Sequence, residues 1–585
     1  MSFPLKVLDW LAALVVVAAL VVGLDSSASD VGTRFIINST ANNTGKFATD
    51  FHDPNVLFGL GYNGQITGSI EGLQTFDSVI PGLFPEGSPE AAWICKRAAD
   101  LDNTIRKVHK AGLKCYAATD LLVLPKALVK KLHSEICDEK DRIDVGRPKT
   151  QELLRAMFRE TFQRFPDLDG VVVRTGEVYL HDFPYHTATG GTSGTQNLRQ
   201  GNTAILHGPQ SHIDILTILR DEVCVKQNKT LFYRTWDFGP KGFHENPEFY
   251  LKVTQAIEPH PNLFFSIKHQ KGDFHQLTPF NPTLMIGRHR QIVEVQSQRE
   301  AYGKGAHPYY IGKGVIEDWE EYDWLMKPGQ RKGLRDLIHD PLFAGVWTWS
   351  GGGGWEGPYI TNDFWNELNT YVVSQYVRNP DRDESSVFAE FAKAKGLNDD
   401  DAALFRKLCL LSTQAVLRGQ LTCLPAKIDV WWARDHFLGA PDLKDFLDKG
   451  LMEKALAEKA EAVRMWKEIE ALSQRIQFPD ASLNDFVATS ATYGRIKYAI
   501  IEQGWTILML GAEGDVSGTY DTDRLSVAIA RYDSLWKEWR ELKETRPSCS
   551  SLYKDVGFDN KPGLGAAVER YRNVVTAAAM HGRAS

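Results

Sequence analysis

The chain has 585 residues, of which 43% are hydrophobic, 24% charged and 11% aromatic, and it carries a net charge of −7. This apolar content excludes a disordered chain, and the excess of acidic residues argues against a nucleic-acid-binding surface. Only 7 of the residues are cysteines, which is too few for a disulfide scaffold. Only one long apolar run is present, which excludes a polytopic membrane protein. The length suits about three domains, or one large barrel with a further domain.

Residues 1–28 have the features of a secretory signal peptide. Lys6 precedes an apolar run over 10–24, and small residues surround Ala28, the expected cleavage point. The run is shorter than the roughly 20 residues of a membrane span, but an uncleaved signal anchor is the alternative. Sequons at Asn38, Asn42 and Asn228 agree with a eukaryotic secretory route. We expect a secreted protein, or one anchored by the uncleaved signal, with residues 29–52 as an N-terminal extension.

Strand and helix patterns alternate over residues 53–380. Helical patterns at 90–111, 150–164, 212–225 and 247–257 separate several of eight β-rich runs, which lie at 56–61, 113–118, 170–174, 230–236, 263–268, 292–296, 309–312 and 343–349. Eight such units predict an α/β fold of the (β/α)8 TIM-barrel type. An open doubly wound sheet is the alternative. No GxGxxG or GxxxxGK[ST] loop follows a strand, so no nucleotide cofactor is expected.

The strand signal stops after residue 380. Amphipathic patterns with apolar residues three and four apart follow at 387–394, 399–418, 442–474, 484–509 and 522–543. Residues 381–585 are therefore expected to form an all-α helical C-terminal domain packed on the barrel. Such a domain also offers a surface for a homodimer.

Candidate site residues were chosen from the expected strand ends, because the active site of a TIM barrel lies at the carboxyl ends of its strands. These positions hold Arg174, Glu177 and Tyr185 after the third run, Arg234 and Trp236 in the fourth, Lys268, His269 and Asp273 in or after the fifth, Glu294 in the sixth, and Trp347 and Trp349 in the eighth.

Carboxylates and cations recur together among these residues. Two carboxylates across a sugar ring are the machinery of glycoside hydrolysis, with Glu177, Asp273 and Glu294 as the candidates. The cations Arg174, Arg234 and Lys268 suit a substrate carboxylate or phosphate, because guanidinium and ammonium groups donate charge-assisted hydrogen bonds. The combination indicates an anionic sugar as substrate.

Structural interpretations compete with these assignments. Charged residues in barrel strands often only neutralise one another, and Glu294 in particular could pair with Arg288 or Arg290. Tryptophans at strand ends either stack on sugars or fill the core. No HxxxH or HExxH pattern and no CxxC is present, so no metal site is expected.

Four segments resemble the family 67 α-glucuronidases, between residues 167 and 379: "GVVVRTGE", "FYRTW", "IKHQKGDF" followed by "TPFNPTL", and "QIVEVQSQREAYGKG". The family removes glucuronic acid or 4-O-methyl-glucuronic acid from xylan-derived oligosaccharides with inversion and without a metal. The resemblance implies that Glu177 is the general acid, Asp273 the general base and Glu294 a second candidate base. It also implies that Lys268 and Arg234 bind the glucuronate carboxylate.

The sequence departs from the family pattern at two points. Arg174 lies three residues before Glu177, where the family has a lysine four residues before its acid, and no room remains for the family's N-terminal β-sandwich. The expected partner is a uronic-acid-containing oligosaccharide or polysaccharide, without nucleic acid or cofactor. Two alternatives stay open: a glycosidase for a different terminal sugar, and a non-catalytic carbohydrate-binding barrel.

Overall fold

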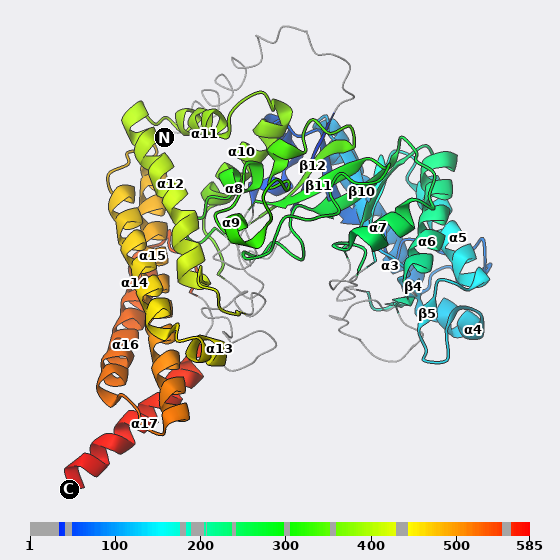
Figure 1. Ribbon diagram of the computed structural model, residues 1–585. Coiled ribbons are helices and arrows are strands. Elements are labelled where there is room, and N and C mark those ends of the chain that lie inside the picture. Colours follow the sequence, from blue (N-terminus) through cyan, green and yellow to red (C-terminus); the bar gives the residue numbers. More distant parts are fainter. Residues whose placement is uncertain are drawn as a thin grey trace, which may run out of the picture.

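The computed structural model describes residues 34–40, 49–175, 183–188, 204–205, 208–236, 242–297, 305–351, 358–428, 443–552 and 563–584. Eight parallel strands close into a barrel in the order β1-β12-β11-β10-β9-β6-β3-β2. The strands are β1 (Phe35–Thr40), β2 (Gly64–Ser69), β3 (Lys114–Asp120), β6 (Gly170–Arg174), β9 (Thr230–Arg234), β10 (Leu263–Lys268), β11 (Gln291–Gln296) and β12 (Phe343–Ser350). A helical region follows the barrel along the chain (Figure 1), so the predicted fold class is confirmed.

Helices that follow the strands cover the outside of the barrel. Among them are α3 (Pro89–Lys110), α5 (Pro148–Arg164), α6 (Pro209–Leu219), α7 (Pro247–Thr254) and, after the last strand, α10 (Phe364–Arg378). Helix α3 illustrates their local cause, because Ser88 caps its first turn, Pro89 opens it, and Ile94, Leu101 and Ile105 are buried along one face. No helix separates β10 from β11, as the sequence indicated.

Two expected strands are wrong. Residues 56–61 fall mostly in helix α2 (Pro54–Gly59), where the Asp53 side chain accepts the Asn55 N–H and Pro54 opens the first turn. Residues 309–312 form no strand and lead into helix α8 (Gly312–Ile316). Leu57 of the first segment and Tyr309, Tyr310 and Ile311 of the second are buried in helix and loop, and short apolar runs do not distinguish these from strand.

The two strands that replace them are β1 and β2. Strand β1 lies within residues 29–52, the expected N-terminal extension, and it pairs with β12 on one side and β2 on the other. The barrel therefore begins at Phe35 rather than after residue 52. At Gly345 of β12 an added Cβ would lie 2.0 Å from the Phe35 carbonyl oxygen, so this glycine permits the close approach that seals the barrel.

The interior of the barrel is filled by an apolar cluster with a member on every strand: Ile37, Ile66, Tyr116, Val172, Phe232, Phe264, Ile292, Ala344 and Trp347. Side chains alternate along a strand, so positions two and four residues further along face the same interior. Asp120, Arg174, Arg234, Lys268 and Glu294 occupy such positions at the carboxyl ends. The apolar cluster thus forms the floor beneath a layer of charged side chains.

Asn38 faces the other side of β1. Its amide donates to Thr348 Oγ1 at 3.0 Å, and the side chain is fully buried. Because this side chain is buried and bonded to β12, we expect no glycan at Asn38 despite its sequon. Asn42 lies outside the described residues, and Asn228 is exposed.

The helical region contains α11 (Glu384–Ala394), α12 (Asp399–Gln420), α13 (Leu443–Asp448), α14 (Met452–Ser473), α15 (Ala481–Ser517), α16 (Thr522–Thr545) and α17 (Leu564–Ala584). The single helix expected over 442–474 is two helices, because Gly450 adopts a positive φ of 60° between them. The bundle stands beside the barrel, and α17 extends away from it (Figure 1). Trp365 of α10 donates to Ser490 of α15 at 3.1 Å across this junction. No described helix combines the length and apolarity of a membrane span.

Candidate active site

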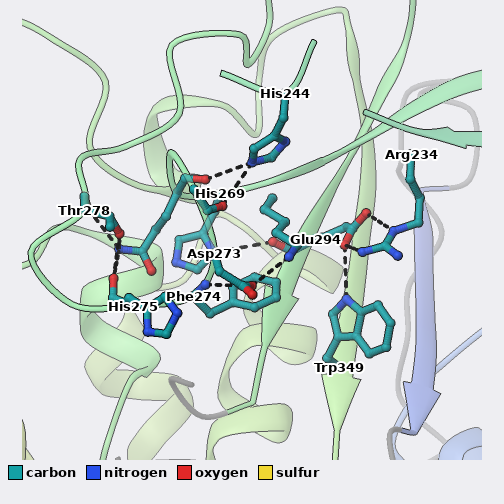
Figure 2. Close-up of polar contacts among 12 residues, drawn as sticks. Arg234, His244, His269, Asp273, Phe274, His275, Thr278, Glu294 and Trp349 are labelled. Carbon is teal, nitrogen blue, oxygen red and sulfur yellow. Dashed lines mark hydrogen bonds and ion pairs between the residues drawn. The ribbon is translucent and has the colours of Figure 1, made fainter. Parts of the chain in front are cut away.

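The first part of the site is a buried ion pair between Arg234 and Glu294. Arg234 Nε lies 2.8 Å from Glu294 Oε1, and Nη2 lies 2.9 Å from Oε2 (Figure 2). Ser266 Oγ donates to Oε1 at 2.9 Å and Trp349 Nε1 donates to Oε2 at 3.1 Å. Each carboxylate oxygen therefore accepts two hydrogen bonds from neighbouring strands.

Glu294 stays ionised although it is fully buried. Burial raises the pKa of Glu294, but the charge and hydrogen bonds of Arg234, the charge of Lys268 and the Ser266 hydroxyl together hold this pKa below its ordinary value. The expected partners Arg288 and Arg290 are engaged elsewhere, with Arg288 bonded to Glu258 and Arg290 lying over the Phe264 ring. Glu294 therefore pairs with a cation, as one of the structural interpretations expected, but the cation is Arg234 rather than Arg288 or Arg290.

Two indoles line the guanidinium of Arg234. Its central carbon lies 5.0 Å from the Trp347 ring centroid and 5.1 Å from that of Trp349, and the two rings stack at 4.8 Å. Trp347 is only 2% exposed and belongs to the apolar floor, whereas Trp349 is half-buried. Of these two candidates for sugar stacking, Trp349 has the accessible face.

The second part of the site is the pair Lys268 and Asp273. Lys268 Nζ lies 2.7 Å from Asp273 Oδ1, which also accepts the Phe274 N–H at 3.0 Å. Nζ lies 3.3 Å from the ring centroid of Trp236, within the range of a cation–π contact, and Trp236 itself is 3% exposed. The register of β10 and β11 sets Lys268 opposite Glu294, so the two ion pairs are neighbours.

The loop that carries Asp273 is held in place by His244. His244 Nε2 lies 3.3 Å from the Gln270 carbonyl oxygen and 3.2 Å from that of Gly272 (Figure 2). Within the loop, Gln270 donates to the His275 carbonyl oxygen at 3.2 Å. The His269 ring is 2% exposed and stacks on Phe274 at 5.7 Å, so His269 supports this loop rather than facing solvent.

The third part of the site is formed by Arg174 with Asp120 and Glu71, two acids that were not among the residues predicted from the sequence. Arg174 Nε and Nη2 lie 2.6 and 2.7 Å from the two carboxylate oxygens of Asp120, at the end of β3. Glu71, just after β2, accepts the Asp120 N–H and the Ser69 hydroxyl. Burial, reinforced by the neighbouring Asp120, raises the pKa of Glu71 to about 8. Asp120 could have been found from its strand end, but Glu71 follows a strand that no pattern indicated.

The remaining predicted residues are Glu177 and Tyr185. Glu177 lies outside the described residues, so its role as general acid stays a prediction. Tyr185 is half-buried and packs edge-on against Trp93 of α3, with the ring centroids 6.0 Å apart. Among the described residues, no three His, Cys, Asp or Glu side chains are grouped closely enough to hold a metal ion.

Comparison with solved structures places the chain among TIM-barrel proteins. A GH138 enzyme targeting pectin rhamnogalacturonan II matches 94% of this chain and 68% of its own, at 10% identity and a TM-score of 0.54. Dispersin B matches 59% of this chain and 99% of its own at 10% identity and a TM-score of 0.32. A GH20 exo-β-N-acetylglucosaminidase from Vibrio harveyi matches 60% of this chain and 55% of its own, at 11% identity and a TM-score of 0.29.

The sequence matches no protein-family model and no curated protein. The similarity to the GH138 enzyme is therefore a similarity of fold, and it spans the barrel and the helical region together. The resemblance to family 67 α-glucuronidases stays a hypothesis.

Proposed function

We propose that this protein is a glycoside hydrolase that releases an α-linked uronic acid, such as glucuronic or 4-O-methyl-glucuronic acid, from plant-type oligosaccharides or polysaccharides. One observation carries the proposal: three cations, each paired with a carboxylate, meet at the carboxyl end of one barrel. This arrangement supplies both the acids of glycoside hydrolysis and the cations that an anionic sugar needs. The GH138 enzyme of similar fold targets pectin rhamnogalacturonan II, so a polysaccharide substrate agrees with this fold.

The contacts favour different roles for the two described carboxylates. Every hydrogen bond to Glu294 stabilises its charge, so this carboxylate is a weak base and serves to orient Arg234. Arg234 uses Nε and Nη2 for that pair, which leaves Nη1 to donate to the carboxylate of a bound sugar. Asp273, on a loop above the strand ends, is then the base that deprotonates the attacking water.

In this mechanism Glu177 protonates the leaving oxygen while water attacks the anomeric carbon from the opposite face. The outcome is inversion, for which the two catalytic carboxyl groups stand about 6.5–9.5 Å apart. Lys268 would hold the sugar carboxylate together with Arg174 and Arg234. Trp349 and Tyr185, both half-buried, would contact the sugar rings.

Product analysis by NMR on a glucuronate-capped oligosaccharide tests the proposal. The wild-type protein should release a uronic acid as the β-anomer first, and Glu177→Gln and Asp273→Asn should each abolish release while circular dichroism stays unchanged. Neutral α-glycosides serve as the substrate control. Release of a neutral sugar, or undiminished release by both variants, would overturn the assignment.

Secretion is part of the same proposal, resting on the apolar run at 10–24 and the small residues that follow it. N-terminal sequencing of the protein from the culture medium should find a chain that begins near Ser29. A cell-bound protein that retains residues 1–28 would support the signal anchor instead. Sedimentation of the same material would test whether the helical region forms a homodimer.

A further inference from the structure

A hollow of about 340 Å³ lies on the helical region, between α14, α15 and α16. Four of its lining residues are cations, namely Arg464 and Lys467 from α14, Arg495 from α15 and Arg531 from α16, whereas Glu502 is the one acid in the lining. This concentration of positive charge stands out in a chain whose net charge is −7.

The cations of this hollow differ in how the protein uses them. Arg495 is held in place by Glu470 and Glu538, at 2.7 and 2.6 Å. Arg464, Lys467 and Arg531 are exposed, and no ion pair links them to a carboxylate in the described parts of the chain. Three cations of the hollow therefore have no ion-pair partner within the described segments of the chain.

Glu502 forms no ion pair with these three cations within the described segments. Its carboxylate accepts a hydrogen bond from the Gln503 side chain at 3.1 Å instead. Burial raises the pKa of Glu502, and the Gln503 hydrogen bond and the charges of Lys467, Arg531 and Arg464 act against this rise. The floor of the hollow is made of Ala460, Val463 and Ala499, whose small side chains leave the space between the helices open. A volume in this range is that of pockets that take small ligands.

We propose that the hollow is a second carbohydrate-binding site, which takes a uronate-bearing segment of the polysaccharide outside the barrel. Arg464, Lys467 and Arg531 would donate charge-assisted hydrogen bonds to the sugar carboxylates, and the aliphatic floor would contact the rings. The choice of a uronate among anions rests on the proposed function. A polymer bound at both places would stay near the barrel between cleavage events, as linked binding sites do.

Calorimetric titration of the full-length protein with trigalacturonic acid tests this site. Wild-type protein should show two binding events, one in the barrel and one in the hollow. The double variant Arg464→Glu/Arg531→Glu should weaken the second event by about tenfold or more, the factor expected for losing even one charge-assisted hydrogen bond. Lys454→Glu/Lys537→Glu is the matched control, because it reverses two exposed cations of the same helices α14 and α16 outside the hollow.

Equal binding by the two double variants would overturn the proposal. So would competition by inorganic phosphate at the same concentration as trigalacturonic acid, since the hollow would then be a general anion site. Maltotriose should not bind there. If the proposed hydrolase activity is wrong, no variant releases uronic acid, yet the difference between the double variants remains, so the two failures are distinguishable.

Discussion

Arg234 and Glu294 lie 60 residues apart in the chain and form a two-pronged ion pair inside the barrel, 2.8 and 2.9 Å long. Both side chains are at most 6% exposed, so neither charge has water as an alternative partner. Removal of one member leaves the other as an uncompensated buried charge. The pair therefore links the stability of the barrel to the integrity of the site.

Arg234→Met should lower the free energy of unfolding by about 3–5 kcal/mol, because it keeps most of the side-chain volume but leaves the Glu294 carboxylate unpaired. Adding Glu294→Gln should restore part of this loss. Urea unfolding followed by tryptophan fluorescence measures both. Arg524→Ala, which breaks the exposed pair with Glu453, is the control and should cost at most about 1 kcal/mol. Equal losses in Arg234→Met and the control would show that breaking the buried pair destabilises the protein no more than breaking an exposed one.

The raised pKa of Glu71 leads to a second prediction, which concerns how the free energy of unfolding depends on pH. Its pKa is about 8 in the folded protein against 4.5 in the unfolded chain, so the folded state holds an extra proton between these values. Stability must therefore fall as pH rises through this window, by at most about 1.4 kcal/mol per pH unit from this group, and level off above it. Glu71→Gln should remove that slope.

The measurement is urea unfolding of wild type and Glu71→Gln from pH 5 to 9. The difference between the two proteins isolates Glu71, because histidines such as His212 and His244, whose pKa values burial lowers, titrate in both. A constant difference across the range would mean that Glu71 is ionised in the folded protein throughout.

The sequence predicted the charged layer better than the pairs within it. Arg234 and Lys268 were predicted because each lies near the end of an apolar strand, and the active site of a TIM barrel lies at the carboxyl ends of its strands. Which carboxylate meets which cation depends on the register between strands that are distant in the chain. Glu294 was therefore expected as a base or as a partner of Arg288 or Arg290, whereas the register brings it to Arg234.

The first two strands were missed for a different reason. Strand β1 reads FIINST and ends in three polar residues, and β2 reads GQITGS, in which only Ile66 and Thr67 are β-branched residues of the kind that usually mark strands. Their pairing with β12 and β3 makes them strands, which is a tertiary effect that local propensity does not contain. Because β2 was not predicted, Glu71, which lies just after it, was not recognised as a residue of the site.

The burial of Asn38 makes a third prediction, about glycosylation. Because Asn38 is fully buried behind β1 whereas Asn228 is exposed, protein secreted from a eukaryotic host should carry no glycan at Asn38 and accept one at Asn228. Peptide mass spectrometry after enzymatic deglycosylation in heavy-oxygen water reads both positions at once. Asn228→Gln should remove the modified peptide and leave secretion intact. A folded, secreted chain with a glycan at Asn38 would contradict the position of β1 in the barrel.

The pair of Lys268 and Asp273 leads to the last prediction, which concerns substrate charge. Lys268→Met keeps an unbranched side chain against Trp236 but removes the ammonium that lies 2.7 Å from Asp273 and faces the site. For a uronoside, kcat/KM should fall by the equivalent of about 2–5 kcal/mol, because a desolvated charge contact to the sugar carboxylate is lost. The methyl ester of the same uronoside lacks that charge, so the wild type and Lys268→Met should differ much less on it. A matched loss on both substrates would mean that Lys268 acts only by positioning Asp273, and the uronate carboxylate would then need a binding group other than Lys268.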